Sequence, residues 1–150
     1  MIRFEESSVI ERPVADVFAL AADPTNDPLW ASAVAEARQT SEGPLRVGTT
    51  FEQVLRLLGR RLEIRFEVTE YEPNRTLHIG RFSGRLRSAV GQRTFEPASA
   101  GTRVTFAAEG ASGLFLNLLE PLVTAAARRA VRRDLANLKA VLEAGQVACG

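Results

Sequence analysis

The chain is poor in the residues that build disulfides, metal centres and proton-transfer sites. It has one cysteine, one histidine, one tyrosine and one tryptophan among 150 residues. Cys149 has no second cysteine with which to form an intrachain disulfide, which fits a reducing compartment. One histidine and one terminal cysteine give no metal-ligand spacing, so we expect no metal and no other cofactor. A Ser-His-Asp triad would have to use His78, which the strand pattern places on an outer, solvated face.

Strong charge and long hydrophobic runs are also missing. The net charge of +1 gives no global field that favours nucleic acid, and no aromatic residues interleave the basic ones. No segment is long and apolar enough to span a membrane, and the N-terminus lacks the apolar run of a signal peptide. We therefore expect a cytoplasmic protein of one domain, residues 1–150, without nucleic-acid partners and without stable membrane insertion.

Most of the chain reads as strands with alternating apolar and polar residues. In the segment from Arg61 to Tyr71, Leu62 and Ile64 share one face with Phe66, and charged residues occupy the other. One apolar and one wet face are typical of an antiparallel sheet. The seven predicted strands are Ile2–Glu11, Ala33–Thr40, Thr49–Leu58, Arg61–Tyr71, Thr76–Phe82, Leu86–Phe95 and Thr102–Glu109.

Two short helical segments follow the first strand, and one long helix ends the chain. Pro13 opens a predicted helix that ends near Ala22, and a second helix or turn surrounds Asp27 to Trp30. Leucines at helical spacing predict a long helix from about Leu114 to Ala144, with Pro121 kinking or restarting it near its beginning.

This order of elements resembles the START-like helix-grip superfamily, and in particular its polyketide cyclase/dehydratase-like (SRPBCC) proteins. The residues that carry the resemblance run from Ile10 to Phe18, then Asp23-Pro24 with Trp30, Gly48 to Phe51, Tyr71 to Leu77, and the hairpin from Thr94 to Phe106. The resemblance implies an α+β helix-grip fold. A curved seven-stranded antiparallel sheet wraps around a long C-terminal helix, and two short helices follow the first strand. The superfamily includes carriers, receptors and cyclases, so the fold does not decide the chemistry.

A strongly curved sheet cannot press its whole concave face onto one straight helix, so we expect a partly open, mostly apolar cavity. The alternative is ordinary core packing. The predicted ligand-binding residues share the inward parity or lie on the facing helices: Phe4, Trp30, Phe51, Gln53, Leu55, Phe66, Leu77, Ile79, Phe106, Phe115 and Leu119.

Charged residues with the same parity are candidates for chemistry. Glu6 alternates with Phe4, Arg81 follows Leu77 and Ile79, and Arg93 precedes an inward phenylalanine. A buried charge must be paired or must meet a ligand. Glu6 could pair with either arginine, or an unpaired arginine could hold a ligand anion. Alternatively, a bulge shifts the parity, or these groups lie at a wet mouth.

The favoured function is binding of a small hydrophobic ligand, such as a lipid, polyketide or aromatic molecule. The first alternative is a polyketide cyclase/dehydratase-like enzyme that performs aldol cyclisation or dehydration. It would use Glu6 as base and Arg81 and Arg93 as oxyanion holders. The second alternative is a protein-interaction module that uses the arginines between Arg128 and Arg133. The sequence leaves open whether the chain is an enzyme and whether two copies associate.

Overall fold

The computed structural model describes residues 2–57, 59–83, 88–110 and 120–148 of the chain. They form a seven-stranded antiparallel sheet with the order β1-β7-β6-β5-β4-β3-β2, and three helical elements. The strands are β1 (Ile2–Ile10), β2 (Val34–Gln39), β3 (Thr50–Leu57), β4 (Arg60–Glu72), β5 (Thr76–Gly80), β6 (Val90–Ala98) and β7 (Gly101–Gly110). The helices are α1 (Val14–Ala21), the 3-10 helix η1 (Pro24–Leu29) and α2 (Glu120–Ala148).

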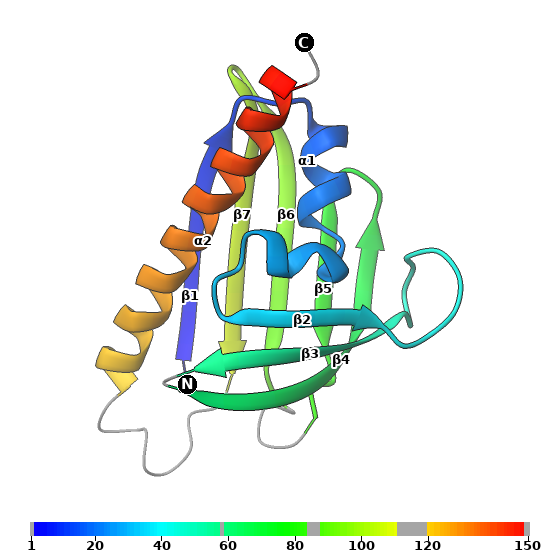
Figure 1. Ribbon diagram of the computed structural model, residues 1–150, viewed down its shortest axis with the longest axis vertical. Coiled ribbons are helices and arrows are strands. Elements are labelled where there is room, and N and C mark those ends of the chain that lie inside the picture. The colour runs from blue at the N-terminus through cyan, green and yellow to red at the C-terminus, as the bar shows by residue number, and fades with distance from the viewer. Residues whose placement is uncertain (1, 58, 84–87, 111–119, 149–150) are drawn as a thin grey trace.

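The sheet bends sharply, so that its first four strands in the spatial order run along the molecule and β2, β3 and β4 cross in front of them (Figure 1). The long helix α2 runs beside β1, α1 packs against β6 and β7, and η1 lies beside β2 (Figure 1). The predicted helix-grip architecture is therefore confirmed. Within the described residues, no helix is both long and apolar enough to cross a membrane.

The inner face of the sheet forms the core. On β4, Ile64, Phe66 and Val68 are buried, whereas the residues between them are exposed or half-buried, as the alternation predicts. A bulge between Val68 and Glu70 then shifts the register against β5 and turns Tyr71 inward against Phe18 of α1. The apolar faces of sheet and helices thus meet in one cluster.

The sixth strand differs most from its predicted bounds, while the ends of the other strands move by one or two residues. The sixth strand begins at Val90 and not at Leu86, although Leu86 itself lies outside the described residues. It also continues past Phe95 to Ala98, so the hairpin to β7 is tighter than predicted. Gly101 makes this turn with a φ of +147°, and a Cβ there would lie 2.1 Å from the carbonyl oxygen of Ile10, which excludes any other residue.

The C-terminal half of α2 is fixed to the end of β1. Leu135, Leu138 and Leu142 are buried on one stripe of the helix. Arg12 donates to the carbonyl oxygen of Leu142 at 2.9 Å, and Lys139 donates to that of Val9 at 3.1 Å. Pro121 falls in the first turn of the described helix, where a missing N–H costs nothing, while the predicted segment Leu114–Leu119 lies outside the described residues.

Candidate functional site

The predicted ligand-binding residues fall into three groups by burial. Six of the apolar ones are buried in the core cluster, namely Trp30, Phe51, Phe66, Leu77, Ile79 and Phe106, and Gln53 is buried beside them. Phe4 and Leu55 are half-buried. Phe115 and Leu119 lie outside the described residues. The inward facing of the strand residues is as predicted, while their contact with a ligand stays a prediction.

Aromatic rings dominate this inner surface. Phe51 stacks on Phe66 with ring centroids 5.6 Å apart, and Trp30 stacks on Phe106 at 5.2 Å. Such offset pairs contribute roughly 0.5–1.5 kcal/mol each beyond the burial of their area. These rings therefore pack against one another within the core cluster.

A buried ion pair joins β6 to η1. Arg93 on β6 forms two hydrogen bonds with Asp27 of η1, at 2.9 Å to Oδ1 and 2.8 Å to Oδ2. The Asp27 side chain is 3% exposed and that of Arg93 is 14% exposed. Gln53 donates to Oδ2 of the same carboxylate at 2.8 Å. The carboxylate thus accepts three hydrogen bonds, and the two buried charges neutralise each other.

The Arg93 guanidinium also joins three other parts of the inner surface. It donates to the carbonyl oxygen of Ala21, at the end of α1, at 2.9 Å. Its central carbon lies 5.3 Å from the Trp30 ring centroid and 5.6 Å from that of Phe106. Cation–π contacts of this kind favour arginine in a desolvated place. The inward facing of Arg93 is as predicted, but its partner is Asp27 and not Glu6.

Sequence reasoning missed Asp27 because it read this segment only as a short helix or turn. The local sequence marks only the start of this helix. Asp23 caps η1 by accepting from the Thr25 N–H, and Pro24 stands in its first turn, as helix starts prefer. Asp27, further along η1, contacts Gln53 of β3 and Arg93 of β6. Only the fold brings it beside Arg93.

Glu6 faces inward as predicted, but its partner is an arginine of α2 and not one of the two strand arginines. Its carboxylate lies 3.1 Å from Nη2 of Arg132 on α2, and the Glu6 side chain is 16% exposed. The predicted pairing of Glu6 with Arg81 or Arg93 is therefore wrong. Helical spacing alone does not show which of the four α2 arginines turns towards β1. The carboxylate stabilises the guanidinium through a hydrogen bond, which raises the pKa of Arg132.

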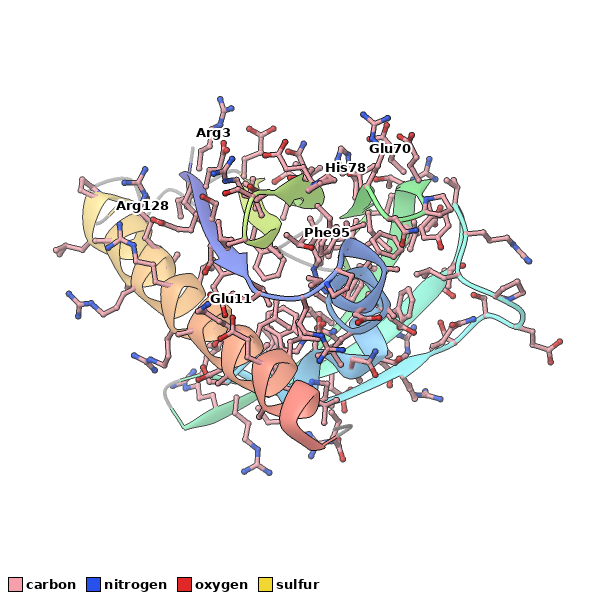
Figure 2. All side chains as sticks on the ribbon, turned by 90° about the horizontal axis from the view of Figure 1, so that it is seen from above. Arg3, Glu11, Glu70, His78, Phe95 and Arg128 are labelled. Atoms are coloured by element: carbon pink, nitrogen blue, oxygen red, sulfur yellow. The ribbon has the colours of Figure 1, made fainter. Side chains whose placement is uncertain are left out.

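The predicted inward position of Arg81 is wrong. β5 ends at Gly80, and Arg81 adopts a left-handed backbone with a φ of +53°, which breaks the alternation. Its side chain is 76% exposed and lies 3.9 Å from Glu67. The outer facing of His78 is as predicted, since it contacts Glu70 on the outer side of the sheet while Phe95 points inward (Figure 2). No group of three potential metal ligands occurs among the described residues.

Burial along the inner face decreases towards one end of the sheet. On β4 the exposed fraction rises from 0% at Val68 through 6% at Ile64 to 43% at Leu62. On β3, Phe51 is buried, its inward neighbour Leu55 is half-buried, and Leu57 is 47% exposed. The inner face is therefore sealed where α1 and η1 lie and more accessible at the β3–β4 hairpin. A separate hollow of about 360 Å³ on the outer face, near Thr76 and Thr94, is lined mainly by hydroxyl groups and carboxylates.

The main chain around Trp30 is held against α2. Asn137 donates to the carbonyl oxygen of Trp30 at 3.1 Å, and Asp134 accepts from the N–H and hydroxyl of Ser32. The Nε1–H of Trp30 is buried and has no hydrogen-bond partner among the described residues. An unpaired donor in a core calls for an explanation. The indole lies where the sealed half of the inner face meets the helix.

Replacing Asp134 by asparagine is expected to change how stability depends on pH. Burial raises the pKa of Asp134 above its ordinary value of 3.8, and the nearby Asp27 adds to this, against the lowering effect of the Ser32 hydrogen bonds. The folded protein therefore holds this proton more tightly than the unfolded chain. The resulting stability is present at low pH and is lost as pH rises through the interval above 3.8. The asparagine side chain would stay neutral and can still accept from Ser32.

Urea unfolding across the acid range tests this expectation. The free energy of unfolding of D134N, relative to that of the unchanged protein, should rise with pH through the interval and then level off. Parallel pH profiles for the two proteins would show that the carboxylate is as well solvated when folded as when unfolded.

Comparison with known families and structures agrees with this geometry. The family model described as "Polyketide cyclase / dehydrase and lipid transport" matches residues 1–143, so the chain belongs to this family. A search of curated protein sequences finds no significant match.

Solved structures show the same fold. The protein TTHA0849 from Thermus thermophilus is 21% identical, with a TM-score of 0.75 over 96% of this chain and 97% of its own. The protein NE0264 from Nitrosomonas europaea is 16% identical, with a TM-score of 0.75 and 97% of both chains covered. The di-domain ARO/CYC StfQ from the steffimycin biosynthetic pathway is 13% identical, with a TM-score of 0.78 over 97% of this chain and 52% of that chain.

Proposed function

We propose that the protein binds a small hydrophobic ligand, of lipid, polyketide or aromatic type, between the inner face of the sheet and α2. The observation that carries the proposal is the combination of an aromatic inner face with buried charges that are already paired. Phe51, Phe66 and Phe106 make the buried inner face aromatic, while Arg93 is neutralised by Asp27. A site of this kind rewards removal of apolar surface from water and offers no uncompensated charge.

Ring closure by aldol chemistry is less well supported by the same geometry. A catalytic base must reach the proton it removes, and an oxyanion holder needs free donors aimed at the developing charge. Glu6 is engaged by Arg132, Arg93 donates twice to Asp27, and Arg81 points into solvent. Among the described residues these three groups do not converge. Binding without chemistry is therefore the function that the arrangement favours.

The ligand is expected to enter where the inner face is most accessible, beside Leu55 and Leu62. These two residues face each other across the β3–β4 hairpin, and Leu62 is 43% exposed although it has the inward parity. Leu62 therefore exposes apolar surface on the inner side of the sheet, and an apolar molecule bound there would remove this surface from water. The sealed half of the inner face would then receive the ligand's far end.

Leu62→Glu is expected to weaken binding of a neutral polarity-sensitive dye roughly tenfold or more, because an apolar molecule would have to desolvate the new carboxylate. Dye fluorescence titration gives the affinity, and competition with fatty acids and flat aromatic molecules gives the preferred class. Val47→Glu is the matched control, since Val47 is 56% exposed in a loop outside the inner face. Equal weakening by both variants, or no effect of Leu62→Glu, would contradict the proposed entrance.

A further inference from the structure

The hairpin between β3 and β4 combines arginines with exposed leucines. Residues 56–62 read Arg-Leu-Leu-Gly-Arg-Arg-Leu, with three arginines and no acidic residue. Leu57 is 47% exposed and Leu62 is 43% exposed. Two of the six exposed large apolar side chains in the described part of the chain therefore lie in this one short hairpin. Leucines exposed singly need no explanation, but two gathered among arginines indicate a surface that something covers.

The arginines of this hairpin outnumber their acidic partners. Arg56 and Arg61 stand directly opposite each other in the pairing of β3 with β4, and like charges placed in this way destabilise a strand pair. Arg61 lies 3.4 Å from Glu36 and 3.8 Å from Glu63. Arg56 and Arg60 are exposed and form no ion pair with any described residue. An anion bound here would therefore relieve a repulsion that the fold leaves in place.

The leucines lie on the side of the hairpin that continues the inner face. Leu57 and Leu62 follow the inward alternation of their strands, whereas Arg56 and Arg61 take the alternate, outer positions. The first turn of α2, where Leu122 is 69% exposed, lies at the same lower end of the molecule as this hairpin (Figure 1). Apolar surface and positive charge thus meet at the end where the inner face is most accessible.

We propose that residues 56–62 dock on the surface of an anionic lipid bilayer. Its headgroups offer phosphates to the arginines, and its acyl chains lie directly below for the leucines. A second copy of this chain would bring arginines against arginines, and a nucleic acid would leave the leucines in water. Because the net charge of the chain is only +1, the attraction depends on this local cluster. The contact is peripheral, and no segment crosses the bilayer.

The docking does not depend on the proposed function, but the two fit together. Leu62 also lies at the expected entrance for the ligand, so the accessible end of the inner face would open at the bilayer surface. Hydrophobic molecules collect in a bilayer because it removes their surface from water. If the proposed function holds, a ligand would pass between the bilayer and the inner face without crossing water.

Co-sedimentation with vesicles tests the proposal, using phosphatidylcholine alone and phosphatidylcholine mixed with phosphatidylglycerol. The unchanged protein should bind only the mixed vesicles, and less strongly as salt is added. Arg56→Glu should weaken this binding roughly tenfold, because it reverses a charge at the surface. Leu57→Ser should weaken it roughly fivefold, because less apolar surface is removed from water. Arg46→Glu, at an exposed arginine in the loop at the other end of β3, is the matched control and should bind normally.

A reporter at the hairpin tests the contact directly. The emission of Leu57→Trp should move to shorter wavelength with the mixed vesicles and stay unchanged with phosphatidylcholine alone. Circular dichroism melts of every variant confirm that the fold is intact. An unchanged protein that ignores the mixed vesicles, a Leu57→Ser variant that binds them fully, equal weakening by Arg46→Glu, or a reporter that does not shift would each overturn the proposal.

Dye titration without lipid separates this proposal from the proposed function. Arg56→Glu should keep the dye affinity of the unchanged protein, because Arg56 lies on the outer side of the hairpin. A chain that binds the dye but not the mixed vesicles would overturn only the docking surface. A chain that binds the mixed vesicles through the hairpin but takes up no dye would support the docking surface and overturn only the proposed function.

Discussion

Replacing Arg93 by methionine is expected to lower the free energy of unfolding by about 3–5 kcal/mol, the largest effect that the structure predicts for one polar side chain. The reason is Asp27, which is 2% exposed and would keep its charge without its main partner. The hydrogen bond to the carbonyl oxygen of Ala21 would also be lost, which loosens the end of α1 from β6. Urea unfolding followed by circular dichroism at neutral pH measures the change.

The double variant Asp27→Leu with Arg93→Met is the control for this prediction. Removing both charges together leaves no uncompensated charge, and apolar residues often replace a buried pair without loss. We expect the double variant to regain most of the stability that Arg93→Met loses. Gln53 would keep its hydrogen bond to the carbonyl oxygen of Pro24. A single variant that costs less than about 1 kcal/mol would mean that water reaches Asp27 and that the pair is not buried.

Replacing Leu138 by alanine is expected to cost about 2–5 kcal/mol of stability. Leu138 is 0% exposed and lies on the stripe of α2 that faces the core, between Leu135 and Leu142. Truncation removes apolar contacts and leaves a cavity that a helix fixed at its C-terminal end cannot easily collapse. Leu122→Ala, at a position on the same helix that is 69% exposed, is the matched control and should cost under about 0.5 kcal/mol.

Equal losses from these two leucine variants would contradict the placement of α2. Urea unfolding under one set of conditions compares them directly. A small loss at Leu138 would show that the helix does not cover the core, and the proposed ligand cavity would then lose its second wall.

The architecture could be predicted from the sequence because its signals are local. Alternation on Leu62, Ile64 and Phe66 predicts a half-buried strand, and leucines at helical spacing predict the long helix. Both patterns depend only on backbone geometry, so the facing of Phe51, Leu77 and His78 followed correctly. The order of the elements then narrowed the fold to one superfamily.

The polar part of the site could not be predicted in the same way. The Asp27–Arg93 pair joins residues far apart in the sequence, and no periodicity connects a short 3-10 helix with a strand. The position of Arg81 depends on one left-handed residue after Gly80, which alternation cannot reveal. Likewise, the partner of Glu6 depends on how α2 is rotated over β1. In each case a tertiary contact or a single dihedral angle, and not a pattern, decides which charge meets which.

The central claim, that a small hydrophobic molecule binds against the inner face, is tested most directly by nuclear magnetic resonance. Trp30 is the only tryptophan, so the ¹H–¹⁵N spectrum should hold a single indole N–H peak, and this N–H is buried without a hydrogen-bond partner in the part of the chain that the structure describes. Titration with the best competitor from the dye assay should shift this peak and the methyl peaks of Leu77 and Ile79 saturably, while His78 on the outer face stays unchanged. A titration that shifts only outer-face residues, or leaves the indole peak in place at saturation, would contradict the account.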